Sequence, residues 1–255
     1  MPVVDGLALE VREPLGEDEL FLLETALPPV MAVVALADRV ATMPGGDAPD
    51  WARWPAAQLG AVALGIRQAW IGDRIVSERR CLLPACGEKV DVSFAITAYV
   101  AHRRPRRPRN VLPDGENGWY VLGRAGVRFR LPTVEDLLAA VTSEDAAATL
   151  AARCLDPAVL SAKVARTVDR ALSALTPSLD GLVGGACPAC GADVTARFDP
   201  IAYTLTELRD VFAGIYRETH TLASAYGWRE KDILRLPRTR RQRYGAMISD
   251  ERSLL

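Results

Sequence analysis

The sequence predicts a mainly α protein with a small β module (α+β), in which helices flank two cysteine-containing turns. Apolar residues make up 49% of the 255 positions and are mostly Ala, Leu and Val, whereas only 6% are aromatic, a composition that suits helices. Apolar side chains recur at three- and four-residue spacing over residues 56–75, which is typical of an amphipathic helix. A cysteine turn occurs twice, and after the first copy residues 90–100 alternate as a half-buried strand does.

The overall charge and hydropathy exclude several classes of protein. A formal net charge of -1 gives no global attraction to nucleic acid or anionic membranes. No apolar run approaches the roughly 18 residues of a spanning helix, and the first residues lack the basic start of a signal peptide. We therefore expect a cytoplasmic protein.

The first 55 residues are predicted to form an N-terminal helical segment followed by a linker. Residues 17–40 indicate one helix or two shorter ones interrupted at Pro28-Pro29, since proline stops a helix. Residues 43–55 are rich in Gly, Pro and Asp and form the linker.

Residues 56–200 are predicted to hold the cysteine module with helices and a basic loop inserted into it. The loop at 103–109 contains two prolines and five arginines, so it should be exposed and non-helical. A β segment is expected over 119–131, followed by a helix from Thr133 to Ala140 with a capping box.

Two more helices are expected before residue 200. One carries Cys154, and the other runs over 158–175 after Asp156-Pro157, with 176–185 as a connector rich in Pro and Gly.

Residues 201–255 are predicted to form a C-terminal helical unit. The longest helix should start at Asp199-Pro200 and end near Tyr226, where Gly227 is a natural C-cap. Two shorter helices are expected at about 230–234 and 239–249.

Two cysteine-containing segments repeat one another at a constant shift. Pro84-Ala85-Cys86-Gly87 matches Pro188-Ala189-Cys190-Gly191, and Phe94 and Phe198 fall at the same offset. Such a turn presents thiolates on one side of a tight loop that glycine closes. Two of these knuckles can complete one tetrahedral metal site.

The first knuckle departs from the paired pattern, because Leu83 stands where a second cysteine is expected. Cys81 is the nearest thiol and gives a Cys-x4-Cys spacing, which zinc sites also use. The sequence therefore predicts a structural zinc in a zinc-ribbon-like module, with Cys154 left over; the alternative is a degenerate site kept for its shape. The predicted zinc ligands are Cys81, Cys86, Cys187 and Cys190.

No recognised catalytic motif occurs, so we expect a protein that is not an enzyme. The two histidines, His102 and His220, have no metalloprotease spacing, and phosphate-binding and nucleophile-elbow glycine patterns are lacking. Basic clusters at 103–109 and 235–243 can neutralise phosphates. Because few aromatic residues are interleaved with the loop arginines, nucleic acid is not the expected partner.

The C-terminal run from His220 to Tyr244 contains Tyr226-Gly227-Trp228, Leu236-Pro237 and Arg240-Arg241. With these motifs the run resembles the baseplate hub assembly family of T-even-type contractile phages and bacterial contractile injection (phage tail-like) systems. Shorter matching pieces occur at 70–74, 130–137 and 152–154.

The resemblance implies a structural or assembly factor of the baseplate or hub, with baseplate, hub or spike proteins as partners and possible incorporation into the particle. A zinc-ribbon nucleic-acid-binding protein is the alternative. Aromatic residues around a helix-to-helix turn favour an interface, and the competing interpretation is a local helical core. The predicted partner-binding residues are His220, Tyr226, Trp228, Arg240, Arg241 and Tyr244.

Overall fold

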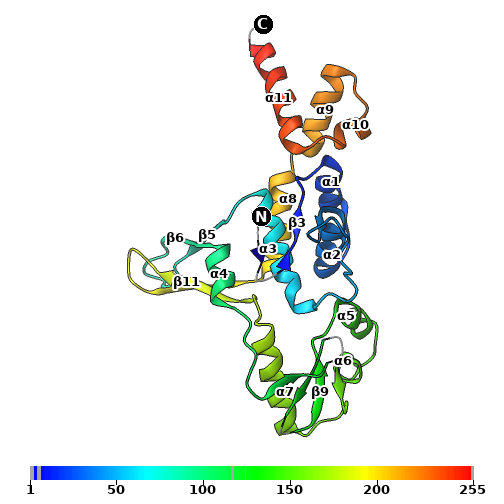
Figure 1. The fold of residues 1–255 in the computed structure, drawn as a ribbon. Coiled ribbons are helices and arrows are strands. Elements are labelled where there is room, and N and C mark those ends of the chain that lie inside the picture. Colours follow the sequence, from blue (N-terminus) through cyan, green and yellow to red (C-terminus); the bar gives the residue numbers. More distant parts are fainter. Residues whose placement is uncertain (1–2, 5–6, 116–117, 124, 254–255) are drawn as a thin grey trace. The chain divides into compact units, whose positions relative to one another are not determined.

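The computed structural model describes residues 3–4, 7–115, 118–123 and 125–253. The fold is mixed α+β (Figure 1), with about 49% of residues helical and 20% in small sheets. The chain forms two compact units. They differ from the three consecutive segments expected from the sequence, because the N-terminal and C-terminal helices belong together. The first unit comprises Met1–Ala48, Val62–Arg74 and Asp199–Leu255, and the second comprises Pro49–Ala61 and Ile75–Phe198.

The first unit begins with short strands and two helices. Helices α1 (Gly16–Glu24) and α2 (Pro29–Val40) are separated at the proline pair, as the sequence predicted. Pro28 is the N-cap and Pro29 the first helical residue of α2, positions at which proline costs no backbone hydrogen bond. The short strands are β1 (Val3–Val4), β2 (Leu7–Ala8), β3 (Glu10–Val11) and β4 (Ala41–Thr42).

Helix α8 (Pro200–Phe212) packs against α1 and α2. The prediction of one helix from Asp199 to Tyr226 is wrong, because the chain breaks at Ala213-Gly214 and resumes as α9 (Ile215–Tyr226). Gly lowers helix stability at this point.

Helices α9, α10 (Glu230–Leu234) and α11 (Arg238–Ser253) pack around Leu222, Ile233 and Ile248. Gly227 has a φ of 67° and ends α9 in the left-handed conformation, which confirms the predicted C-cap.

A buried ion-pair network joins the N-terminal and C-terminal helices of this unit. Arg241 is fully buried, and its guanidinium donates to Glu19 at 2.6 Å and to Glu218 at 2.9 Å. Arg238 adds a second contact to Glu19 at 3.2 Å. Because a buried charge is stable only when paired, these contacts fix α11 against α1.

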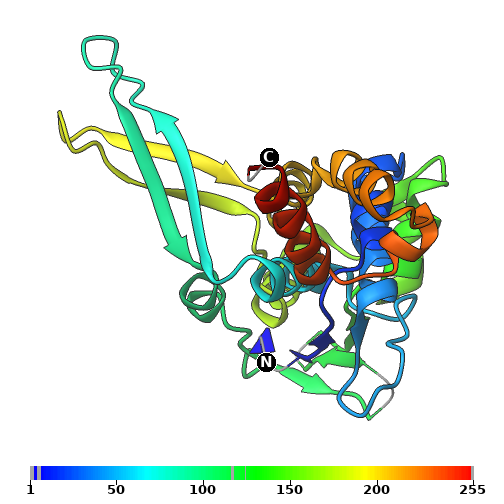
Figure 2. The same ribbon diagram turned by 90° about the horizontal axis from the view of Figure 1, so that it is seen from above.

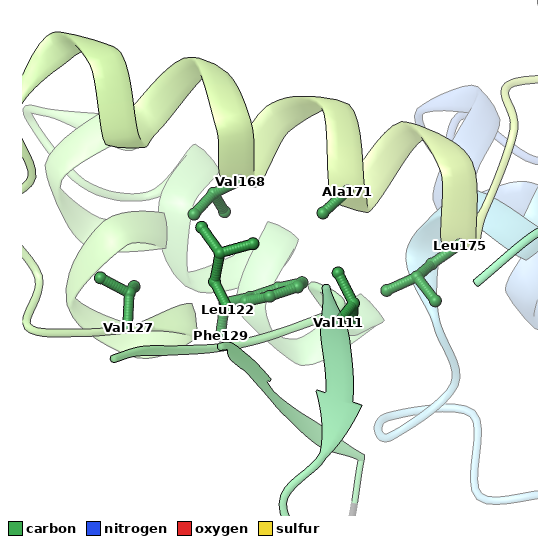
Figure 3. Close-up of a cluster of buried hydrophobic side chains, with 7 residues drawn as sticks. All are labelled: Val111, Leu122, Val127, Phe129, Val168, Ala171 and Leu175. Atoms are coloured by element: carbon green, nitrogen blue, oxygen red, sulfur yellow. The ribbon is translucent and has the colours of Figure 1, made fainter. Parts of the chain in front are cut away.

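In the second unit, a four-stranded sheet packs against one face of a helix. The strands run in the order β10 (Leu155–Asp156), β9 (Val127–Arg130), β8 (Trp119–Leu122) and β7 (Val111–Pro113). Val111, Leu122 and Phe129 meet Val168 and Ala171 of α7 (Ala162–Leu175) in a buried cluster (Figure 3). The predicted start of this helix at residue 158 is wrong, because the preceding Asp156 pairs in β10 and Ser161 is the N-cap.

Helices α3 (Leu59–Trp70), α5 (Val134–Val141) and α6 (Ala146–Cys154) lie between the N-terminal segment and α7 in the sequence. A 3-10 turn, Ala56–Gln58, precedes α3, within the helix predicted for residues 56–75, and most of α3 belongs to the first unit. In the second unit, α5 begins at the predicted capping box, with the Asp136 N–H donating to the Thr133 hydroxyl. Helix α6 carries Cys154 as expected.

Two β-hairpins carry the cysteine turns. Strands β5 (Arg74–Arg80) and β6 (Lys89–Ala95) form one, and β11 (Gly181–Ala186) and β12 (Asp193–Phe198) form the other. Figure 2 shows both as long two-stranded ribbons with a turn at the tip. The predicted strand 90–100 is too long, because α4 (Ile96–His102) replaces its second half.

The predicted connector 176–185 is wrong at its end, because residues from Gly181 onward form β11. At Gly184 a Cβ atom would lie 2.1 Å from the Val194 carbonyl oxygen, so only glycine permits this close pairing. Among the described residues, no helix combines the length and apolar character needed to cross a membrane.

Candidate metal centre

Four cysteines from the two hairpin tips converge. Their Sγ atoms all lie within 4.8 Å of one another, and these cysteines could hold a metal ion. The Cys81 and Cys190 Sγ atoms are 3.6 Å apart, and those of Cys86 and Cys187 are 3.8 Å apart. Four sulfurs bonded tetrahedrally to one ion at about 2.3 Å would be separated by about 3.8 Å. Both of these pairs fit that arrangement.

The two turns are built by equivalent backbone hydrogen bonds. Cys81 N–H donates to the Glu88 carbonyl and Cys187 N–H donates to the Ala192 carbonyl, both at 2.8 Å. Each acceptor lies two residues after the second cysteine of its turn. Cys81 therefore occupies the place in the first hairpin that Cys187 occupies in the second.

The longer spacing of the first knuckle is absorbed in its exposed tip. Gly87 and Gly191 follow the second cysteines with φ of 60° and 74°, values that glycine adopts without strain. Leu83 accepts the Cys86 N–H at 2.9 Å through its backbone carbonyl, while its side chain is 47% exposed. The missing cysteine at Leu83 is therefore compatible with four converging thiols.

The knuckles bury only a small apolar cluster of their own. Cys81 and Cys187 are buried with Val90 and Val194, the residues that begin the alternating patterns of β6 and β12. N–H donation from Ala189 lowers the pKa of Cys187 to about 7 despite the opposing effect of burial. Its thiolate, which is the metal-binding form, is thus favoured. For Cys86 and Cys190, a backbone hydrogen bond to each sulfur is outweighed by burial and the neighbouring thiols, so the pKa values of these two cysteines are raised instead.

An aromatic cluster closes the base of the paired hairpins. Phe94 and Phe198, the two residues at equal offset in the repeat, meet edge to face with ring centroids 5.1 Å apart. Tyr99 of α4 packs 5.2 Å from Phe198 and donates its hydroxyl to the Leu179 carbonyl. The sequence repeat had already singled out Phe94 and Phe198. Tyr99 was not singled out, because residues 90–100 were predicted to form one strand.

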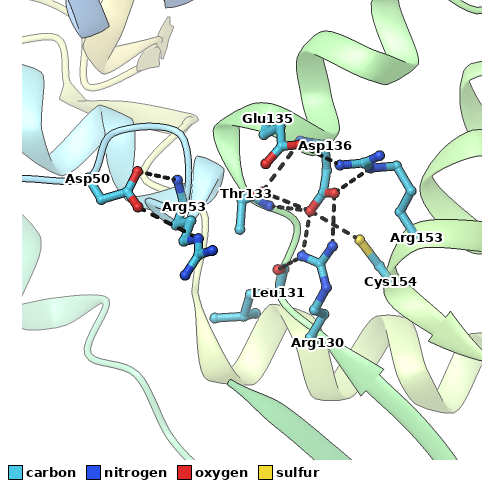
Figure 4. A network of polar contacts seen from close by, with 9 residues as sticks. All are labelled: Asp50, Arg53, Arg130, Leu131, Thr133, Glu135, Asp136, Arg153 and Cys154. Atoms are coloured by element: carbon cyan, nitrogen blue, oxygen red, sulfur yellow. Dashed lines mark hydrogen bonds and ion pairs between the residues drawn. The ribbon is translucent and has the colours of Figure 1, made fainter. Parts of the chain in front are cut away.

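Apart from the cysteines, a cluster of polar side chains in this unit surrounds the fully buried Asp136 (Figure 4). Arg130 donates to both carboxylate oxygens, and Arg153 donates to Oδ1 at 2.6 Å. Cys154 lies with its Sγ 3.6 Å from Oδ2, and burial raises its pKa to about 11. Cys154 is therefore a buried thiol of this network and takes no part in the four-cysteine cluster.

The C-terminal residues predicted to bind a partner divide into two groups. Tyr226, Trp228 and Tyr244 form one aromatic cluster, with centroid separations of 4.9, 5.0 and 5.8 Å. Trp228 and Tyr244 also pack against the local core of α9 to α11, while Tyr226 is 36% exposed.

The remaining three residues of that group lie nearby in different environments. His220 and Arg240 are exposed, and the Arg240 guanidinium lies 5.9 Å from the Tyr244 ring centroid. Arg241 is fully buried on Glu19 and Glu218, which assigns it to the interior of the first unit and not to a partner-binding surface.

In comparisons with known proteins, no family model, curated protein or solved structure matches the chain.

Proposed function

We propose that the chain is a structural or assembly factor for the baseplate or hub of a contractile phage tail-like injection system, acting by protein–protein interaction. The observation that carries the proposal is the aromatic cluster of Tyr226, Trp228 and Tyr244, which lies in the segment with the family resemblance. Amphipathic aromatics anchored on a packed base and exposed at one edge are typical of interface anchors.

The exposed cation beside this cluster supports the same role. Arg240 contacts the Tyr244 ring and is exposed, so aromatic and guanidinium groups lie on one surface. Tyr, Trp and Arg are the residue types that contribute most to binding free energy at interfaces.

The four-cysteine cluster is proposed to hold zinc as a structural ion in a ribbon-like module. Zinc favours four thiolates in tetrahedral geometry, and such a site leaves no coordination position open for a substrate. The proposed ion would link segments about a hundred residues apart, since the two cysteine pairs are separated by 101 and 109 positions. Its role in this proposal is to stabilise the fold.

Single substitutions in the aromatic cluster test the proposed interface. Trp228→Ala and Tyr244→Ala should each weaken co-purification with baseplate proteins by about 30-fold, because truncating a buried interface anchor costs about 2 kcal/mol or more. Tyr216→Ala is the matched control, since Tyr216 is an aromatic residue of α9 that is 54% exposed and lies outside the cluster. Circular dichroism establishes that each variant is folded.

Removing the whole C-terminal segment would be a poorer test, because it would leave the buried Glu19 without Arg241. Folded Trp228→Ala and Tyr244→Ala variants that still co-purify and assemble as the wild type does would show that these aromatics serve only the local core. Loss of binding in Tyr216→Ala as well would point to a general defect of the unit.

A further inference from the structure

A pocket in the second unit lies between the basic loop and the edge of the four-stranded sheet. It has a volume of about 680 Å3, which is within the range of small-ligand sites. Arg106 and Arg107 line it on the loop side, and Trp119 and Tyr120 of β8 line it on the sheet side. Leu175, the last residue of α7, also lines it.

The loop arginines carry positive charge that the described part of the chain leaves uncompensated. Arg104, Arg106, Arg107 and Arg109 are exposed, and none of them forms an ion pair with a described carboxylate. No acidic residue is among the described residues that line the pocket. Asp114, close by in sequence, is already paired with Arg128 at 2.5 Å.

The loop is held in place at three points, so its charges are positioned before any ligand binds. Arg103 lies over the Tyr99 ring, 3.9 Å from its centroid. The Arg106 N–H donates to the Ala174 carbonyl at 2.7 Å, and Pro108 accepts the N–H at the start of β7. A loop fixed in this way loses little conformational entropy on binding.

The aromatic residues of the pocket come from β8 and lie outside the arginine loop. Tyr120 pairs in register with Pro113, and its ring stacks on Phe129 at 5.7 Å. It is half-buried, so the core fixes its orientation while part of it remains at the pocket. Nucleic acid was not the expected partner because few aromatic residues lie within the loop itself. In the fold, Trp119 and Tyr120 line the same pocket as the loop arginines, so this argument no longer applies.

We propose that this pocket and the basic loop form a binding site for single-stranded nucleic acid. The arginines would neutralise successive backbone phosphates, and the pocket would accept an unpaired base against Tyr120. Basic surfaces combined with aromatic platforms are how proteins bind single strands without reading their sequence. A duplex keeps its bases stacked and presents only phosphates to such a pocket. The site is independent of the proposed baseplate interface in the first unit.

The test uses the full metal-loaded chain and a fluorescent 20-nucleotide oligothymidylate, with affinity measured by anisotropy at several salt concentrations. An abasic strand of equal length and charge should bind at least about tenfold more weakly, because it has no bases to stack. A duplex of the same length should also bind more weakly. Equal affinity for the abasic strand, the duplex and oligothymidylate would overturn the site, since charge alone would then explain binding.

Two variants locate the site. Arg106→Gln with Arg107→Gln should weaken binding at least about tenfold and reduce the salt slope by about 1 to 2, because each substituted arginine leaves one phosphate without its cation. The control is Arg166→Gln with Arg217→Gln, which removes two exposed arginines away from the pocket lining. Equal decreases in affinity for the two double variants would contradict the proposal.

Tyr120→Leu keeps an apolar side chain on Phe129 but removes the aromatic ring. The variant should bind oligothymidylate and the abasic strand with equal affinity. The salt dependence of its affinity should match that of the wild type, because the arginines are unchanged. If the preference for oligothymidylate persists in a folded Tyr120→Leu variant, the base does not bind where we propose. If the variant does not fold, the comparison of the two strands on the wild-type protein still decides whether bases are recognised.

Discussion

The paired hairpins and the four-stranded sheet belong to the same compact unit, yet they are stabilised by different chemistry. The hairpin tips bury little beyond Cys81, Val90, Cys187 and Val194. The sheet instead packs against α7 through a cluster of seven buried residues with further apolar neighbours around it. The proposed metal ion would stabilise the hairpin tips, where apolar burial is scarce, whereas the sheet should stay folded without it.

The comparison also separates the five cysteines by role. Four lie at turns, with Cys187 favouring its thiolate form. The fifth, Cys154, is buried, and this burial, together with the neighbouring Asp136 carboxylate, favours its neutral thiol. The same residue type thus serves as a candidate metal ligand at one place and as a small buried group at another.

The largest effect is expected from breaking the four-cysteine cluster. Cys187→Ser should release the metal and disorder both hairpins, because a structural zinc contributes on the order of 10 kcal/mol to folding in small ribbons. Hydrogen exchange should accelerate sharply over residues 75–95 and 181–198 and change much less over 111–130. Cys154→Ser is the matched control and should retain the metal.

Equal loss of protection in the sheet of Cys187→Ser would contradict the separation of the two regions. Metal loss in Cys154→Ser would contradict the assignment of Cys154 to a different role.

The next largest effect is expected in the apolar cluster. Phe129 is completely buried in it, and Phe129→Ala should lower the free energy of unfolding by about 4 kcal/mol because it leaves a cavity. The variant should keep its metal while it is folded. Denaturant melting with metal quantification checks both points, and a folded variant without metal would show that the two regions are coupled.

A smaller effect is expected at Asp136. Asp136→Asn should cost about 3 kcal/mol, because Arg130 and Arg153 lose the partner that their charges require. Denaturant melting at neutral pH measures the change. The metal content should not change, since Asp136 is no member of the cysteine cluster.

The same carboxylate predicts a pH dependence. Burial acts to raise the pKa of Asp136, but hydrogen bonds from Arg130, Thr133 and Arg153 outweigh it and hold the pKa well below its ordinary value of 3.8. Such a group contributes stability that is present above pH 3.8 and is lost as the pH falls toward the native pKa.

The protection of the Leu122 and Phe129 amides, corrected for the slower intrinsic hydrogen exchange in acid, should therefore decrease below about pH 4 in the wild type, where carboxylates with unperturbed pKa values also begin to protonate. In Asp136→Asn the decrease in protection should be shallower. An identical profile in both proteins would rule out this contribution. Leu122 and Phe129 are chosen because they lie in the sheet. Acid also releases a bound metal, but that release should act on the hairpins, so the sheet amides report the effect of Asp136 alone.

The sequence predicted the elements whose signals are local. The proline pair between α1 and α2, the capping box at Thr133 and the C-cap at Gly227 were each found where expected. The knuckle repeat also predicted which four cysteines converge, because a repeated turn implies a repeated geometry.

Elements that depend on distant partners were not predictable in the same way. Residues 181–186 are glycine-rich and look like a connector, and they become a strand only because β12 lies close to Gly184. Strand β5 is mostly charged and exposed, so it lacks the alternating pattern. Arg241 looked like a surface residue because Glu19 lies 222 positions away in sequence.

Metal analysis of freshly purified native protein tests the central claim most directly. Elemental analysis with native mass spectrometry should find one zinc per chain, held by Cys81, Cys86, Cys187 and Cys190. Cys187→Ser should contain none, and Cys154→Ser should contain one. Native protein that carries no metal, or a Cys187→Ser variant that keeps a full equivalent of zinc, would contradict the claim that a metal ion joins the two hairpins.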